Sequence, residues 1–209
     1  MDSVPDDVAA INLADLARIN RFTGARRHLI TSLRRRFAST DSFRFLDVGA
    51  ASGDLARAVK SAFPNAKVFC LDLQFRNLRA APAPQLQADA FALPFGNHSF
   101  DVVHASLFLH HFDDSAAGRL IVEMHRLSSA LLLIQDLHRH WLAYYFLPVT
   151  APIFGWHPVT VGDGMKSVAA GWRRHELEAL LSPLGLLSRA KITWHFPSFR
   201  YFIAITSTK

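Results

Sequence analysis

Acidic residues and glycines stand together early in the chain, at the end of an apolar run. Residues 43–48 predict a short buried strand, and residues 47–53 (DVGAASG) close it. Glycines in such a turn let the backbone approach a ligand, and they let the next helix begin close to the strand. The turn therefore predicts a binding site for a small molecule.

Three later apolar runs also end in residues that can contact a bound small molecule. Asp72 follows the second run, Asp89 and Ala90 follow the third, and Ser106 and Leu107 close the fourth. A carboxylate at the position of Asp72 can accept both hydroxyls of a ribose, and Asp89-Ala90 suits an adenine edge. In an open α/β sheet, ligands bind at the carboxyl ends of the strands. These residues are therefore expected in one site.

A nicotinamide dehydrogenase is the main competing interpretation of the turn. Its fingerprint, G-x-G-x-x-G, needs three glycines and normally has no acid before them. Here the order is Asp-x-Gly-x-x-x-Gly, with Asp47 first. That order favours a ligand with an amino group near the turn, which Asp47 can attract.

Histidines form a second group of candidates. His110 and His111 follow the fourth strand, and Asp136 and His138 follow the fifth. A histidine titrates near neutral pH, so it can deprotonate a phenol, an enol or an activated carbon. Asp136 or His138 can orient the nucleophile. The same residues also fit structural roles, as packing histidines and a helix cap, and both interpretations stay open. No metal site is predicted.

The elements that position these residues alternate along the chain. The predicted strands are residues 43–48, 67–71, 86–88, 101–106, 130–135, 188–194 and 199–206. The predicted helices are residues 12–37 with a break at Thr23-Gly24, 55–63, 75–80, 116–127 and 172–184. This alternation predicts an α/β fold with a mostly parallel sheet covered on both faces. The last two strands are too close in sequence for a crossover helix, so they are expected to be antiparallel to each other.

With the motifs in view, a family resemblance emerges. FLDVGAASGDLA (45–56) resembles motif I of class I S-adenosylmethionine-dependent methyltransferases, and VFCLDL (68–73) resembles motif II. LPFGNHSFDVVHASLFLHHF (93–112) resembles the motif IV region of the bacterial, quinone-biosynthesis-like (type 11) group. The resemblance covers roughly residues 42–135. It implies a Rossmann-like, seven-stranded sheet in the order 3-2-1-4-5-7-6, with the seventh strand antiparallel.

The resemblance also implies S-adenosyl-L-methionine as the cofactor and a role for each motif residue. By this resemblance, the methionine end of the cofactor is bound by Asp47, Gly49, Ala50 and Gly53. The ribose and the adenine are bound by Asp72, Leu73, Asp89 and Ala90. Ser106 and Leu107 line the sulfonium region. The family usually has glycine where Ala51 stands. An alanine there is expected to fit only with a negative φ.

The acceptor is less sharply defined. After the fourth strand the chain lacks the Asn/Asp-Pro-Pro-aromatic motif that is typical of amino methyltransferases. The aromatic segment 141–156 lies in an insertion, 137–171, that we interpret as lid-like over a hydrophobic acceptor, although plain packing of a helical insert is the alternative. The stretch 136–140 with this insertion is similar to methyltransferases encoded near type III polyketide synthases, which implies a phenolic or polyketide-like acceptor. With such an acceptor, we expect methylation at oxygen or at carbon.

Composition sets broader limits. The chain has 209 residues, half of them hydrophobic, which predicts a single domain (1–209) with residues 1–40 as a helical cover. Its net charge is +6, so an RNA methyltransferase is a second hypothesis and a non-catalytic cofactor-binding protein a third. The N-terminus shows no signal peptide and no apolar run reaches spanning length, so a cytoplasmic location is expected. Cys70 lies in an apolar run and is expected to be buried.

Overall fold

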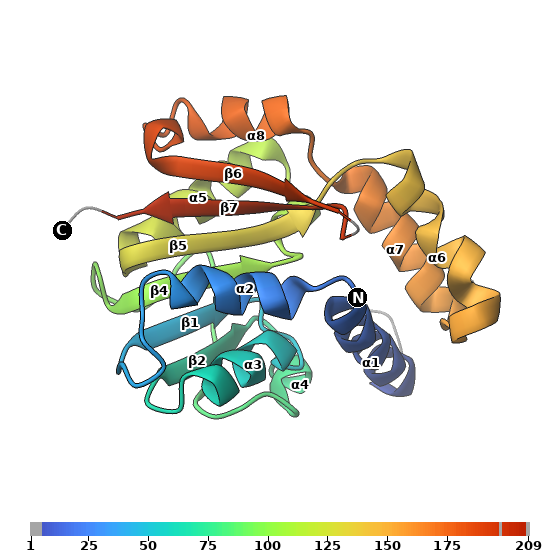
Figure 1. The fold of residues 1–209 in the computed structure, drawn as a ribbon, viewed down its shortest axis with the longest axis horizontal. Helices are drawn as coiled ribbons and strands as arrows, with labels where there is room; N and C mark the ends of the chain where they lie inside the picture. The colour runs from blue at the N-terminus through green and yellow to red at the C-terminus, as the bar shows by residue number, and fades with distance from the viewer. Residues whose placement is uncertain (1–5, 197, 208–209) are drawn as a thin grey trace.

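A computed structural model describes residues 6–196 and 198–207, and its centre is a seven-stranded sheet (Figure 1). The strands are β1 (Arg44–Val48), β2 (Lys67–Asp72), β3 (Gln85–Gln87), β4 (Phe100–Ser106), β5 (Ser128–Leu137), β6 (Ala190–His195) and β7 (Arg200–Thr206). Their order is β3-β2-β1-β4-β5-β7-β6. β1 to β5 pair in parallel, and β7 pairs antiparallel with both β5 and β6. The predicted fold class and strand order are confirmed.

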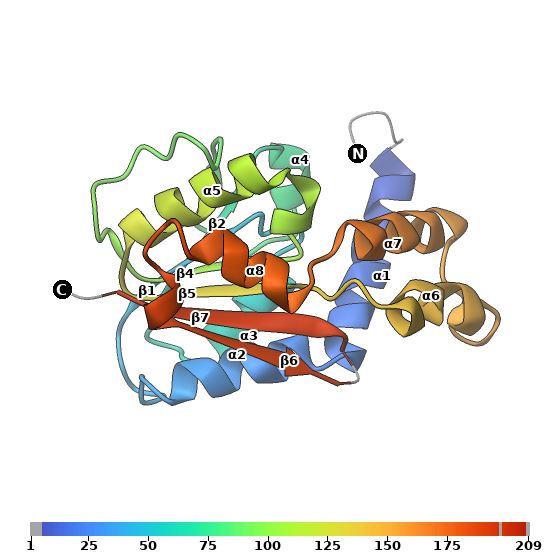
Figure 2. The ribbon, with the colours of Figure 1, turned by 90° about the horizontal axis from the view of Figure 1, so that it is seen from above.

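Helices cover both faces of the sheet and its carboxyl edge. They are α1 (Asp6–Phe22), α2 (Ala25–Arg34), α3 (Asp54–Ala62), α4 (Phe75–Leu78), α5 (Asp114–Leu127), α6 (Trp141–Phe154), α7 (Pro158–Ala170) and α8 (Arg174–Leu181). Two short 3₁₀ turns, η1 (Leu109–His111) and η2 (Leu187–Arg189), join them. α2 and α3 lie on one face, and α5 and α8 on the other (Figure 2).

Each face has its own buried apolar core, because the central parallel strands are apolar on both sides. One core joins Leu46, Val103 and Ile134 to the buried face of α5 and α8. The other joins Phe45, Val102 and Cys70 to α2 and α3. Cys70 is fully buried as predicted, and burial raises the pKa of its thiol to about 12.

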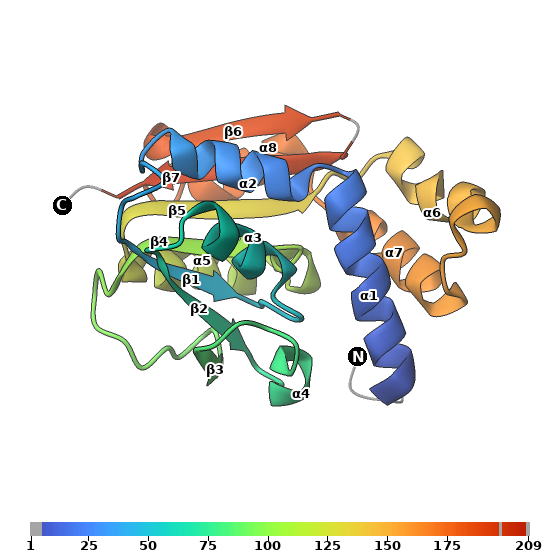
Figure 3. The same cartoon turned by 60° about the horizontal axis from the view of Figure 1, so that its bottom comes forward.

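Three helices lie beyond the carboxyl ends of the strands, where the predicted site residues also gather. α1 crosses this edge, with α7 and then α6 beside it (Figure 3). Buried Asp15 of α1 fastens the group, since its Oδ2 accepts hydrogen bonds from the Thr160 hydroxyl at 3.0 Å and from the His157 backbone N–H at 3.1 Å.

The segment 137–171 differs in detail from its sequence-based prediction. It forms two helices, and α7 falls in a stretch for which no element is predicted. α6 continues through Pro148 and Pro152, although proline usually interrupts a helix. Within the described chain no helix combines the length and apolarity needed to cross a bilayer.

Candidate active site

A cleft of about 360 Å³ opens at the carboxyl ends of β1, β2, β3 and β4, with α1 as its cover. Nearly all the predicted cofactor residues line it. They are Asp47, Gly49, Ala50, Asp72, Leu73, Asp89, Ala90, Ser106 and Leu107. Gly53 does not line the cleft, because it caps α3 just behind the turn. The strand order brings these residues together from four separate parts of the sequence.

Glycines are required in the turn after β1 because of both backbone angle and space. Gly49 has φ +68°, and a Cβ there would lie 2.7 Å from Cδ2 of Phe108. Gly53 has φ +69°, and a Cβ there would lie 2.9 Å from the Ala81 backbone. Both distances are shorter than a carbon–carbon contact allows. The turn therefore packs closely against the next loops and leaves its backbone facing the cleft.

Ala51 corrects one expectation. Its φ is +48°, in the left-handed region, and not negative as the sequence argument requires. The Ala51 backbone N–H donates to Oδ2 of Asp72 at 3.2 Å, and this bond holds the turn. A left-handed alanine costs about 1–2 kcal/mol. Strain of this kind persists where surrounding contacts fix the backbone.

Asp72 is held in place at the end of β2. Its Oδ1 accepts hydrogen bonds from the Gln74 backbone N–H at 3.0 Å and from the Asn77 side chain at 3.1 Å. Together with the bond from Ala51, these contacts fix the orientation of the Asp72 carboxylate, which lines the cleft. Leu73 beside it is 63% exposed, so its apolar side chain is free to pack on a flat ring.

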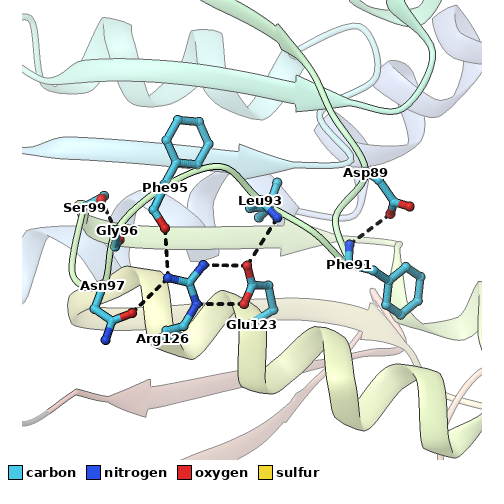
Figure 4. A network of polar contacts seen from close by, with 9 residues as sticks. All are labelled: Asp89, Phe91, Leu93, Phe95, Gly96, Asn97, Ser99, Glu123 and Arg126. Atoms are coloured by element: carbon cyan, nitrogen blue, oxygen red, sulfur yellow. Dashed lines mark hydrogen bonds and ion pairs between the residues drawn. The ribbon is translucent and has the colours of Figure 1, made fainter.

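The loop that carries Asp89 is held against α5 by hydrogen bonds to an ion pair of that helix, Arg126 and Glu123 (Figure 4). Arg126 forms a two-pronged contact with Glu123 at 2.8 and 2.6 Å, and also donates to the Phe95 carbonyl at 2.8 Å. The Arg126 hydrogen bonds lower the pKa of Glu123. Asp89 itself accepts from the Phe91 backbone N–H at 2.9 Å. The loop therefore presents Asp89 in a defined position.

Asp47 is buried and belongs to a chain of side chains across the sheet. Its Oδ1 lies 2.7 Å from Nδ1 of His104, and Nε2 of His104 lies 3.2 Å from Nε2 of Gln135. If the Gln135 amide donates, His104 must carry its proton on Nδ1 and donate to Asp47. Sequence reasoning missed His104, although a histidine inside a valine-rich strand was a visible signal.

Asn20 and Asp54 close the inner end of the cleft. Asn20 of α1 is buried and donates to both carboxylate oxygens of Asp54 at 3.3 Å. Arg26 lies 3.5 Å from the same carboxylate. Burial raises the pKa of Asp54. Arg18 of α1 pairs with Asp15 at 3.2 Å and lies over the ring of Trp156.

Three of the four predicted catalytic residues come together beside the cleft. Nδ1 of His110 lies 2.6 Å from Oδ1 of Asp136, and the His110 backbone N–H donates to Oδ2 at 3.1 Å. Both residues are buried, and Nε2 of His110 has no hydrogen-bond partner among the described residues. His111 lines the cleft, with its ring 4.2 Å from that of His110. Burial lowers the pKa of His111, and the adjacent His110 lowers it further.

His138, the fourth, lies outside the cleft lining. Its ring packs edge-on against Tyr201 at 5.0 Å, and burial lowers its pKa. Asp136 accepts hydrogen bonds from His110, and its predicted role in orienting a nucleophile stays a prediction, as does that of His138.

The aromatic segment also points away from the cleft. Trp141, Tyr145, Val149 and Ile153 of α6 are all more than half exposed, and none of them lines the cleft. α7, which contacts both α1 and η1, is the part of the insertion nearest the histidines. Its role as a lid stays a prediction.

Comparisons with known proteins agree with this geometry. Residues 46–129 match a family model described as a methyltransferase domain. A 96-residue stretch is 34% identical to the ubiquinone/menaquinone biosynthesis C-methyltransferase UbiE of Burkholderia vietnamiensis, over 41% of this chain and 39% of that protein. The chain therefore spans well under half the length of this curated relative.

Solved structures extend the likeness to most of the chain. Magnesium protoporphyrin IX methyltransferase of Synechocystis PCC 6803, solved with bound S-adenosylhomocysteine (SAH), superimposes with a TM-score of 0.61 at 16% identity, over 90% of this chain and 84% of that one. A methyltransferase from Aquifex aeolicus gives 0.54 at 15% identity, over 85% and 87%. The predicted methyltransferase fold and resemblance are confirmed.

Proposed function

We propose that this chain transfers a methyl group from S-adenosylmethionine to a small hydrophobic or aromatic acceptor, at oxygen or carbon. The observation that carries the proposal is the convergence of Asp47, Asp72 and Asp89 on one cleft beneath a glycine turn. Their order along the strands corresponds to the methionine, ribose and adenine parts of that cofactor. The methyltransferase-domain match covers the same residues.

The cleft fits the proposed cofactor by its own geometry. Gly49 adds no side chain of its own to the cleft wall, so the ring of Phe108 packs directly against the turn. Asp72 would accept the ribose hydroxyls, Leu73 would pack on the adenine, and Asp89 would meet the adenine amino group. Buried Asp47, oriented by His104, would attract the ammonium group. When bound, the cofactor supplies a sulfonium-activated methyl group.

His110 and Asp136 supply the acid–base part of the proposal. Asp136 accepts a hydrogen bond from Nδ1 of His110, which leaves Nε2 as the unprotonated, unpartnered nitrogen in the neutral ring. That nitrogen can take a proton from a phenol or an enol. General-base help of this kind contributes about 10²–10⁴ in rate, and alignment of the acceptor supplies more.

Two observations support a hydrophobic or aromatic acceptor. Phe91, Phe108 and Phe112 line the cleft together with Leu13 and Leu16 of α1, and apolar walls favour apolar ligands. The relatives named above act, by their names, on ubiquinone or menaquinone precursors and on magnesium protoporphyrin IX. Both names refer to ring-containing molecules, which agrees with an aromatic acceptor.

RNA, the second hypothesis, gains less support from the structure. Arg36 donates to the carbonyl of Ala130 near the start of β5, so the arginines at the end of α2 lie at the edge of the sheet opposite the cleft. A titration with RNA at several salt concentrations tests this hypothesis, because phosphate contacts give steep salt dependence.

Calorimetry with SAH tests the cofactor assignment. We expect Asp72→Ala to weaken binding by about 100-fold or more, because two charge-assisted hydrogen bonds are lost. Asp41→Ala is the matched control, since Asp41 only accepts from the Ala38 backbone in an exposed turn. Unaltered affinity in Asp72→Ala would remove the ribose assignment.

A further inference from the structure

Arg200, the first residue of β7, is buried in a way that its own neighbours do not explain. Its side chain is 1% exposed, and its Nε and Nη1 atoms have no hydrogen-bond partner in the part of the chain that the structure describes. Buried polar groups are nearly always hydrogen-bonded, and a buried charge without partners is strongly unfavourable. Such a group suggests a binding site whose ligand completes the hydrogen bonds.

The position of Arg200 connects both parts of the candidate active site. β7 lies between β5 and β6 (Figure 1), and Arg200 is in register with Leu137, the residue after Asp136. Its charge interacts with the carboxylates of Asp136 and Asp54. Asp136 holds His110, and Asp54 lines the cleft. Arg200 therefore stands at the carboxyl end of β5 and interacts electrostatically with both parts of the site.

Neither of these carboxylates accepts a hydrogen bond from Arg200. Asp54 accepts from Asn20, and Asp136 accepts from His110 and from the Leu137 backbone. Desolvation lowers the pKa of Arg200 to about 10, so the side chain is still a cation at neutral pH. Positive charge and free donors are thus retained in a buried place.

We propose that Arg200 binds a carboxylate of a ligand in this site, through paired charge-assisted hydrogen bonds from its guanidinium. A planar guanidinium matches a carboxylate in a two-pronged contact. The carboxylate can come from the methionine end of the cofactor or from the acceptor. This inference rests on the proposed function, because it assumes that the cleft binds these two molecules.

Two buried acceptor atoms of the candidate active site fit the same ligand. Oδ1 of Asn20 and Oε1 of Gln135 also have no partner among the described residues. Gln135 lies two residues before Leu137, on the same face of the sheet as Arg200. A carboxylic acid that also carries an ammonium or hydroxyl group would satisfy donors and acceptors together.

The test compares Arg200→Met and Arg200→Lys with Arg174→Met, whose arginine pairs with Glu178 on the surface. Thermal unfolding without ligand comes first. We expect Arg200→Met to be at least as stable as the wild type, because an unpaired buried charge is removed. A large loss of stability in both Arg200 variants would indicate a purely structural arginine and overturn the proposal.

Binding then distinguishes the two sources of the carboxylate. Calorimetry uses SAH and methylthioadenosine, which lacks the amino-acid end; benzoate, added with saturating SAH, is the acceptor probe in thermal unfolding. If the cofactor supplies the group, Arg200→Met weakens SAH binding about 10- to 100-fold and leaves methylthioadenosine unchanged. If the acceptor supplies it, SAH affinity is unchanged and the stabilisation by benzoate disappears.

Arg200→Lys should recover part of either effect, since it keeps the charge without the planar pair of donors. Wild-type affinity for SAH combined with no Arg200-dependent effect of benzoate overturns the inference. A wild-type protein that does not bind SAH at all contradicts the proposed function instead.

Discussion

The two halves of the candidate active site are built differently. In the cofactor half, the carboxylates of Asp47, Asp72 and Asp89 all have partners within the chain. The acceptor half, formed by η1, the end of β5, β7 and the insertion, contains buried polar atoms without partners in the described chain: His110 Nε2, Gln135 Oε1, His138 Nδ1 and two nitrogens of Arg200. The cofactor half also has such atoms, namely Asn20 Oδ1, Arg26 Nε and Ser106 Oγ, but its three carboxylates are fixed, and the acceptor half has more atoms without partners among the described residues.

The family match follows the same division. It ends at residue 129, before the end of β5, the insertion and β7. A cofactor used by many enzymes needs one preformed cleft, whereas each acceptor needs its own polar groups. The difference teaches that specificity for the acceptor is to be sought in the residues after the family match, and not in the shared motifs. The following changes test that difference, from the largest expected effect to the smallest.

The largest effect should come from the hydrogen-bonded residues His110 and Asp136, the proposed general base and its partner in the acceptor half. We expect His110→Gln and Asp136→Asn to lower turnover of a phenolic acceptor about 100- to 10,000-fold, with SAH affinity within twofold of wild type. Radiolabelled methyl transfer and calorimetry give the two numbers. His125→Gln is the matched control, because its Nε2 is also buried and unpartnered but lies on α5. Loss of cofactor binding in His110→Gln would break the separation of the halves.

A glycine in each half should respond differently to alanine. Gly53→Ala places a Cβ against Ala81 at a positive φ, so the free energy of unfolding should fall by about 2–4 kcal/mol. Gly155→Ala, at the end of α6, has the same backbone strain with nothing within 4 Å, and should cost about 1 kcal/mol. Urea unfolding measures both. Equal losses would show that the turn after β1 is not tightly packed.

Stability should also depend on pH through several histidines. The pKa is lowered, mainly by burial, for His28, His111, His125, His138 and His195. Below the ordinary histidine pKa the unfolded chain then binds more protons than the folded one, so stability falls as pH drops from 7 to 5. The raised pKa of Asp54 acts in the opposite direction, because the folded state takes up its proton more readily.

Urea unfolding between pH 5 and pH 8 measures this dependence. His28→Gln should reduce the slope, since one of the contributing histidines is removed. A free energy of unfolding that is constant over this range would mean that these histidines are no harder to protonate in the folded protein.

The smallest effect should come from Ala51→Gly. Relief of the left-handed alanine gains about 1–2 kcal/mol, and the greater freedom of glycine in the unfolded chain offsets about 0.4–1 kcal/mol. The net gain, about 0.5–1 kcal/mol, should appear in urea unfolding with unchanged SAH affinity. Gly49→Ala is the control in the same turn, and it should lower the free energy of unfolding, because it adds a Cβ at a positive φ. Destabilisation by Ala51→Gly would mean that the methyl group of Ala51 contributes to packing.

Local patterns were sufficient to predict the fold and the meeting of nine of the ten candidate cofactor residues at one cleft. The glycine turn and the strand-end residues Asp72 and Asp89 depend on contacts near in sequence, and the alternation of strands and helices determines how they meet. The last strand pair was predicted for the same reason, since its short connection leaves no room for a crossover.

Long-range contacts limited prediction elsewhere. The link from Asp47 through His104 to Gln135 joins three strands, and nothing local indicates it. Arg200 looks like an ordinary surface arginine until β7 places it between β5 and β6. The φ of Ala51 was wrongly expected because its strain depends on Asp72, 21 residues away.

The place of β7 between β5 and β6 has a consequence for how the protein is made. Synthesis proceeds from the N-terminus, so β5 emerges from the ribosome long before residues 200–206, which pair with it. Until then one edge of β5 is open to other strands, and exposed edges of this kind promote aggregation. The cofactor cleft can form early in translation. The nascent chain acquires Arg200, and covers this edge of β5, only after the insertion, α8 and β6 have been made.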